Sequence, residues 1–261
     1  MTIVKHELRQ GRTAFWIWTG ALSFLLATCV FLFPEMKGEM DQVSDLFASM
    51  GAFTDAFGMD KLNFGTLTGY YAIECGNTLG LGGAFFAALT AAAALCGEEK
   101  NRTAEFLLTH PVSRTRVVTE KLISVLLRMI ALNLVVFAVG ATSVAVIGEE
   151  IPWKELALLH LAYGLMCVEI AGICFGISAF LRSGSAGIGI GVAALLYIAN
   201  LLANITEKAA FLKWLTPFAY CDGGGIVSDG NLDWGKVGVG MGIALAAIGA
   251  AYWYYPRKDI R

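Results

Sequence analysis

The chain alternates between long apolar runs and shorter polar segments. Each run approaches or exceeds the length of about 20 residues that a helix needs to cross roughly 30 Å of hydrocarbon. Runs such as "GAFFAALTAAAALC" lack the alternation of apolar and polar positions that a membrane β-barrel strand requires. The pattern therefore predicts an all-α integral membrane protein with six transmembrane helices, at residues 13–33, 75–96, 122–147, 156–181, 184–205 and 237–255.

Composition agrees with a membrane location. Hydrophobic residues make up 57% of the 261 residues and charged residues make up 15%. Soluble domains have about 45–50% and about 25%, respectively. The mean hydropathy is +0.65. The net charge of −2 says little about partners. The apolar composition makes the lipid bilayer a partner, and no nucleic acid is expected.

Basic residues are distributed unevenly among the polar segments. The segments that hold 12 Lys and Arg in 45 residues are 1–12, 97–121, 182–183 and 256–261. The segments that hold 6 in 80 residues are 34–74, 148–155 and 206–236. Because cytoplasmic loops carry the excess of basic residues, the first set is predicted to be cytoplasmic, together with both the N-terminus and the C-terminus.

Two of the polar segments have amphipathic patterns of their own. In residues 1–12, Ile3, Val4 and Leu8 lie beside the charges, which predicts either a short helix on the inner membrane surface or an ordered cytoplasmic tail. The outer segment 34–74 is predicted to hold a helix across the outer mouth, with a disordered acidic loop as the alternative. Its apolar residues at spacings of three and four are Met40, Val43, Leu46, Phe47 and Met50.

Small residues recur every four positions in three of the runs, which allows close packing of helices. They are Gly76, Gly80, Ala84, Ala88, Ala92 and Cys96 in the second run, Ser183, Gly187 and Gly191 in the fifth, and Gly238, Gly242, Ala246 and Ala250 in the sixth. We expect these stripes to be packing seams within the bundle. A homodimer face formed by one of them is the alternative.

Catalytic and metal-binding motifs are scarce. The sequence holds no His-Glu-x-x-His, Gly-x-Ser-x-Gly or Cys-x-x-Cys pattern. Residues 230–237 have the spacing of a phosphate-binding loop, but Val237 occupies the position of the required Ser or Thr. We therefore expect no enzymatic activity, no metal site and no bound cofactor. Cys75 and Cys221 both fall on the outer side, and the sequence leaves open whether they pair.

Ionisable and polar residues inside the membrane are the remaining candidates for chemistry. Glu169 is predicted to lie mid-span, roughly 18 Å from the inner end of its run, and Arg128 about 10 Å from the inner end of its own. Asn133 is predicted at about the depth of Glu169. A hydrogen bond between Glu169 and Asn133 is therefore expected in preference to an ion pair with Arg128. Both a structural role and a proton or substrate role for Glu169 stay open.

The charged segment 97–121 is the only sizeable loop on the predicted cytoplasmic side. Asn101 or Thr103 can cap a short helix there. Pro111 would end that helix, and Ser113 can cap the next one. The carboxylate in the first turn and the apolar edge would come from Glu105, Phe106, Leu107 and Leu108. The segment is thus predicted to form a compact helical knob.

This segment closely resembles the first cytoplasmic loop of type 2 ABC exporter permeases. In that loop, acidic residues precede a Gly-Thr-x-Glu-x-Leu-Leu stretch, which Pro-Val-Ser-Arg and a Lys follow. The matching positions here are Glu98, Glu99, Thr103, Glu105, Leu107, Leu108, Pro111, Val112, Ser113, Arg114 and Lys121. Arg102 stands where the family usually has Gly, which leaves the start of the helix open. The N-terminal segment, the six spans and the outer segment extend the resemblance over most of the chain.

The resemblance implies a transmembrane permease subunit without an ATPase of its own. Two permease copies, or one copy and a homologous permease, would work with two copies of a soluble ABC ATPase, which binds ATP and Mg, in a bacterial plasma membrane. Residues 1–12 would be an interfacial elbow helix, and a coupling helix would lie between helices 2 and 3. The residues expected to contact the ATPase are Glu98, Glu99, Arg102, Thr103, Glu105, Phe106 and Leu107.

The cargo of such an exporter is left open by the sequence. A hydrophobic or amphipathic peptide, drug or lipid is favoured, because the spans offer apolar walls and few fixed charges. Two alternatives belong to other functional classes. One is a proton- or ion-coupled secondary transporter that uses Glu169, and the other is an intramembrane enzyme, which would need a nucleophile and a base facing each other at one depth.

Overall fold

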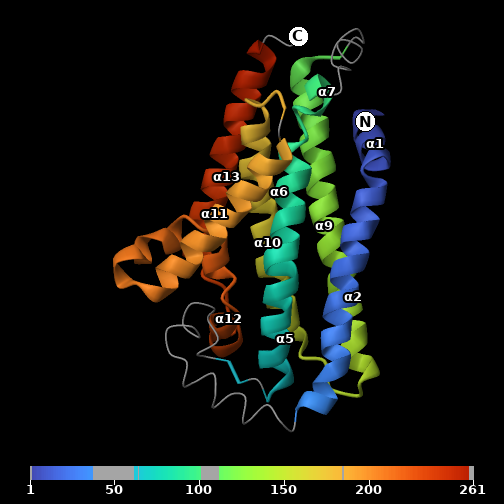
Figure 1. Cartoon of the computed structure of the whole chain (residues 1–261), viewed down its shortest axis with the longest axis vertical. Helices are drawn as coiled ribbons and strands as arrows, with labels where there is room; N and C mark the ends of the chain where they lie inside the picture. Colours follow the sequence, from blue (N-terminus) through green and yellow to red (C-terminus); the bar gives the residue numbers. More distant parts are fainter. Residues whose placement is uncertain (1, 38–61, 64, 101–111, 184, 259–261) are drawn as a thin grey trace.

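The computed structural model describes residues 2–37, 62–63, 65–100, 112–183 and 185–258. Within these residues every regular element is helical, and six segments are long and apolar enough to cross a membrane (Figure 1). They are α2 (Arg12–Met36), the continuous segment Leu67–Ala92, α9 (Arg114–Val146), α10 (Trp153–Ser178), α11 (Ser185–Ile205) and α13 with its extension (Trp234–Arg257). The predicted all-α membrane fold with six spans is confirmed.

The second span differs most from its predicted bounds. It begins at Leu67 rather than at residue 75, because the Thr66 side chain caps it by accepting a hydrogen bond of 3.2 Å from the Gly69 N–H. The Thr, Tyr and Glu residues of its first two turns lower its apolarity in the sequence. The span consists of α5 (Leu67–Cys75), the π-helix η1 (Gly76–Gly83) and α6 (Ala84–Ala92).

Short helices connect or extend the spans. They are α1 (Thr2–Gln10), α7 (Gly97–Lys100), η2 (Glu207–Trp214), η3 (Pro217–Tyr220), α12 (Gly223–Asp229) and η4 (Tyr255–Arg257). The segment predicted as an outer loop thus contains η2, η3 and α12, and Phe218, Tyr220 and Cys221 within it are buried. The helix predicted around Phe47 lies outside the described residues.

The centre of the bundle is α10, which packs against α5, α6, α9 and α13. Its fully buried apolar side chains include Leu156, Leu159, Met166 and Ile170. Its close approach to α13 depends on glycine: a Cβ atom at Gly176 would lie 2.5 Å from the carbonyl oxygen of Ala247. Small residues at this interface therefore let two helical backbones meet, as in other membrane bundles.

The predicted small-residue stripes have different surroundings. Ala84, Ala88 and Ala92 of α6 are buried, and a Cβ atom at Gly189 of α11 would lie 2.9 Å from the carbonyl oxygen of Ala88. The stripe of the second span is therefore a packing seam. The stripe positions with open space where a Cβ would stand are Gly187, Gly191, Gly238 and Gly242. At these positions α11 and α13 form no seam within the described chain, so the expectation of bundle packing is wrong there.

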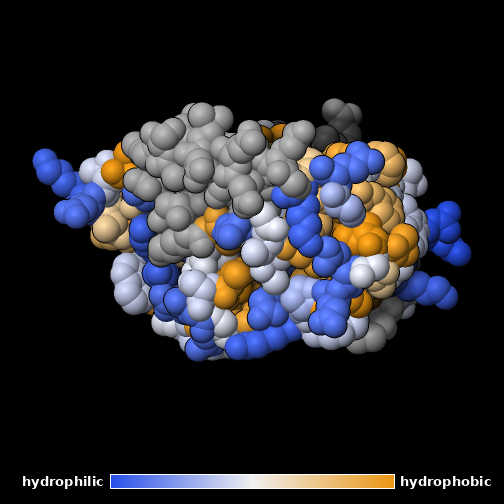
Figure 2. Space-filling model, turned by 90° about the horizontal axis from the view of Figure 1, so that it is seen from below, coloured by the Kyte–Doolittle hydropathy of each residue, from blue (hydrophilic) through white to orange (hydrophobic). Residues whose placement is uncertain are grey.

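The start of α1 and the end of η4 lie at the same end of the bundle as α7 and the first turns of α9 (Figure 1). We call this the inner end, because the basic residues predict that these segments are cytoplasmic. The side of the membrane that it faces stays a prediction. The opposite end carries α12 and the start of α5, and Figure 2 shows hydrophilic residues scattered among hydrophobic ones over its visible part.

Candidate functional site

The predicted coupling loop is described only at its two stems. The first stem is α7, which includes Glu98 and Glu99. The second is the start of α9, where the Ser113 side chain accepts a hydrogen bond of 3.3 Å from the Arg116 N–H. The predicted cap at Ser113 is therefore confirmed. The predicted ATPase-contacting residues that lie outside the described residues are Arg102, Thr103, Glu105, Phe106 and Leu107.

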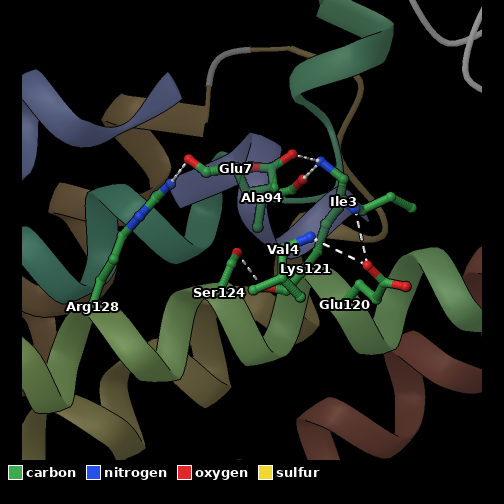
Figure 3. Close-up of polar contacts among 8 residues, drawn as sticks. All are labelled: Ile3, Val4, Glu7, Ala94, Glu120, Lys121, Ser124 and Arg128. Carbon is green, nitrogen blue, oxygen red and sulfur yellow. Dashed lines mark hydrogen bonds and ion pairs between the residues drawn. The ribbon is translucent and has the colours of Figure 1, made fainter. Parts of the chain in front are cut away.

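Lys121 of α9 joins three parts of the chain at the inner end (Figure 3). Its Nζ atom donates a hydrogen bond of 2.7 Å to the carbonyl oxygen of Ala94, in the turn between α6 and α7. The same atom forms an ion pair of 2.9 Å with Oε1 of Glu7 on α1. The exposed fractions of the Lys121 and Glu7 side chains are 3% and 15%. A buried cation therefore ties the stem of the loop to both α1 and α9.

Glu120 and Arg128 hold α1 against α9 (Figure 3). Glu120 Oε2 accepts hydrogen bonds from the N–H groups of Ile3 at 3.0 Å and Val4 at 3.2 Å, at the beginning of α1. Arg128 donates to the carbonyl oxygen of Glu7, near the end of α1. The acid thus lies at the N-terminus of α1 and the base toward its C-terminus, which complements the helix dipole.

Lys258, just after η4, anchors the first stem of the loop. Its Nζ atom lies 2.6 Å from Oε1 of Glu99 in α7 and donates a hydrogen bond of 2.6 Å to the carbonyl oxygen of Leu181. The Lys258 and Glu99 side chains are 3% and 6% exposed. Arg114 donates to the carbonyl oxygens of Pro256 at 3.3 Å and Lys258 at 2.6 Å. The C-terminal segment therefore links the inner ends of four helices.

These charged residues form what we call the inner polar cluster: Glu7, Glu99, Arg114, Glu120, Lys121, Arg128 and Lys258. The sequence predicts that most of them lie in cytoplasmic loops. Glu99, expected to contact an ATPase, uses its carboxylate within the chain. The signal that could have revealed the cluster is the presence of both acidic and basic residues in the same short inner segments, where topology alone needs only basic ones.

The three predicted intramembrane polar residues bind three different partners. Glu169 Oε2 accepts a hydrogen bond of 2.9 Å from the Tyr220 hydroxyl. Asn133 Nδ2 donates to the carbonyl oxygen of His160 at 3.0 Å, and Arg128 belongs to the inner polar cluster. The expected hydrogen bond between Glu169 and Asn133 is therefore wrong. The predicted span starts at residue 122, whereas α9 already begins at Arg114. Asn133 therefore lies farther from the inner end than expected, and it meets α10 at His160, nine residues before Glu169.

Buried hydroxyl and thiol groups occupy the outer half of the bundle. The Tyr71 hydroxyl lies 2.8 Å from His160 Nε2, and the Tyr163 hydroxyl donates a hydrogen bond of 3.0 Å to the carbonyl oxygen of Cys221. Cys75 and Cys221, whose pairing the sequence left open, are both buried free thiols. Among the described residues, no group of three His, Cys, Asp or Glu side chains is placed to hold a metal ion.

Comparison with protein families agrees with this architecture. The family model described as ABC-2 family transporter protein matches residues 1–260, and no curated protein matches the sequence. The chain belongs to the ABC-2 transporter family. It is accordingly a multi-pass permease subunit of an ABC transporter, and its family implies an ABC ATPase as partner.

Proposed function

We propose that this permease is the membrane subunit of an ATP-driven exporter, in which the inner polar cluster transmits movement of the loop to the spans. Two permease copies and two soluble ATPase subunits would form the complex in a bacterial plasma membrane, and the ATPase would hold ATP and Mg. The observation that carries the proposal is that two buried cations anchor the first stem of the loop, Lys258 at Glu99 and Lys121 at Ala94.

The contacts of the stems give two routes for transmission. A displacement of α7 passes through the pair of Glu99 and Lys258 to α13, and through Leu181 to the turn after α10. A displacement of the turn before α7 passes through Ala94 and Lys121 to α1. These contacts measure 2.6 to 2.9 Å and are shielded from water. Charge-assisted hydrogen bonds are strongest in such shielded surroundings.

The second span offers a third, direct route. It continues from the loop through α6 into the π-helix η1, and π-helical turns inside α-helices are frequent at functional sites. Gly76, Gly80, Gly82 and Gly83 all lie in η1. In this proposal the second span bends at η1 when the loop moves, and the other residues of the loop contact the ATPase. Those residues are Glu98, Arg102, Thr103, Glu105, Phe106 and Leu107.

A hydrophobic or amphipathic cargo fits the apolar character of the spans. Between α2 and α9 lies an open groove of about 440 Å³ whose lining includes Phe31, Val135, Val139 and Val146. The hydroxyl groups in its lining, those of Thr142 and Ser143, bond to carbonyl oxygens of their own helix. The groove therefore presents no free polar group of its lining side chains, which supports a peptide, drug or lipid with a large apolar surface.

The proposal is tested in lipid nanodiscs that contain the permease and its ABC ATPase. Phe106→Ala and Glu105→Ala are expected to weaken co-elution of the ATPase or to uncouple ATP hydrolysis from transport, with membrane insertion unchanged. Arg182→Ala, at an exposed position in the other inner loop, is the matched control and should behave as wild type. Transport that runs on a proton gradient without ATP, or wild-type behaviour of both loop variants, would overturn the proposal.

A further inference from the structure

The coupling mechanism leaves one buried acidic group without a role. Glu169 lies within α10 and is 0% exposed. Its Oε2 atom accepts the hydrogen bond from Tyr220, whereas its Oε1 atom is buried without a hydrogen-bond partner in the described part of the chain. The carboxyl group lies against Gly240 of α13, where a Cβ atom would stand 2.6 Å from Oε1. A glycine thus makes room for the carboxyl group between two helices.

The surroundings of Glu169 do not suit a negative charge. A carboxylate offers about four acceptor positions, and only the Tyr220 hydroxyl donates to it among the described groups. No ion pair with a described cation is formed, since Arg128, the basic residue in the neighbouring span, is bonded to Glu7 instead. An isolated buried carboxylate is strongly disfavoured and takes up a proton instead.

The neighbouring titratable groups add no positive charge. Tyr220, the last residue of η3, and Cys221, which follows it, are the titratable groups of another element that interact with Glu169 among the described residues. Cys167, two residues away on α10, is a buried free thiol. The nearest face of α13 presents Gly240. His160 is nine residues away along α10, about 13 Å at the rise of a helix, and its Nε2 atom is in contact with Tyr71.

The segment around Tyr220 is itself held in place by buried contacts. Cys221 and Phe218 are buried, the Cys221 carbonyl oxygen accepts a bond from Tyr163 at 3.0 Å, and the Thr216 hydroxyl donates to the carbonyl oxygen of Leu196 at 2.8 Å. Polar contacts on both sides of Tyr220 therefore hold it over the carboxyl group. We propose that Glu169 is a proton-binding site, occupied in the conformation seen here and sealed by Tyr220.

The chemistry of the site is a single proton transfer. When the segment that carries Tyr220 withdraws, water reaches the carboxyl group, the O–H bond of Glu169 breaks, and the water takes the proton. A carboxylate remains, and it must bind a proton again before the segment can close over it. The site does not replace ATP as the energy source, and its occupancy is independent of the ATPase contacts.

Infrared difference spectroscopy on the full-length permease in lipid nanodiscs tests the proposal. Subtracting the spectrum of Glu169→Gln from that of wild type should reveal a carbonyl band of a protonated carboxylic acid at neutral pH. Glu150→Gln, which removes an exposed carboxylate at the outer end, should replace carboxylate bands by the amide bands of Gln and show no band of a protonated acid. Tyr220→Phe removes the hydrogen bond to the acid but keeps the ring, so the acid band should move to higher wavenumber.

Two results would overturn the proposal. One is a Glu169 signal in the carboxylate region at neutral pH with no acid band. The other is an acid band that stays in place in Tyr220→Phe, which would mean that Tyr220 does not contact the proton-binding group. A variant that fails to assemble is recognised by its elution profile, and the more conservative Glu169→Asp, which keeps an acid band of its own, then takes its place in the comparison.

Discussion

Replacing Lys121 by Met tests whether the inner polar cluster holds the bundle together. Met has a similar length, but it cannot pair with Glu7 or donate to the carbonyl oxygen of Ala94. Removing one partner of a buried ion pair typically costs about 3–5 kcal/mol, because the other charge stays buried and unpaired. The Glu7 side chain is 15% exposed, so water can reach it in part. We therefore expect Lys121→Met to lower the free energy of unfolding by about 2–4 kcal/mol.

The partner variant Glu7→Gln keeps a hydrogen-bond acceptor for Lys121 and removes the charge, so we expect a smaller loss of about 1–2 kcal/mol. If the two side chains interact as in the structure, the double variant should lose less than the sum of the single variants, by about 1–2 kcal/mol. The free energies are measured by reversible unfolding with SDS in mixed micelles.

Lys208→Met is the matched control for this cycle, because Lys208 is an exposed lysine in η2. It should change the free energy of unfolding by less than about 0.5 kcal/mol. If the loss for the double variant equals the sum of the losses for Lys121→Met and Glu7→Gln within about 0.5 kcal/mol, the two side chains are energetically independent. The role of Lys121 as the anchor of α1 would then be refuted.

Three further predictions address other parts of the molecule. Lys258→Gln, which breaks the ion pair with α7, should leave ATPase co-elution intact but lower the transport obtained per ATP hydrolysed; unchanged coupling would contradict the transmission route through α13. Gly240→Ala should destabilise the permease by about 1–3 kcal/mol by overpacking against Glu169, whereas Gly242→Ala, which has open space at its Cβ, should change stability little in the same unfolding assay. In intact cells, an impermeant thiol reagent should label a cysteine introduced at Glu150 and not one introduced at Arg182; reversed labelling would invert the predicted orientation.

Much of the fold could be predicted from the sequence, because a membrane span has to be long and apolar whatever its neighbours are. The runs at 13–33 and 184–205 correspond closely to α2 and α11. The cap at Ser113 was also predictable, since capping depends on residues within one turn of each other. The family resemblance could also be recognised from the sequence, because the loop motif is one continuous stretch of residues.

The start of the second span required the tertiary structure. Tyr70 and Tyr71 look too polar for a span, but their hydroxyl groups bond to the carbonyl oxygen of Cys29 and to His160, which belong to other helices. Burial of a polar group depends on whether a partner meets it. That partner cannot be identified from the local pattern of apolar residues, so the span appeared eight residues shorter at this end than it is.

The partners of the charged residues were likewise decided only in three dimensions. Counting residues gives an approximate depth along a helix, but whether two side chains meet also depends on the rotation of each helix and on its true first residue. Asn133 therefore contacts His160 and not Glu169. Lys121 and Lys258 fall in predicted cytoplasmic loops in the sequence. They are buried because carboxylates more than 100 residues away along the chain, those of Glu7 and Glu99, reach them, together with carbonyl oxygens from other inner turns.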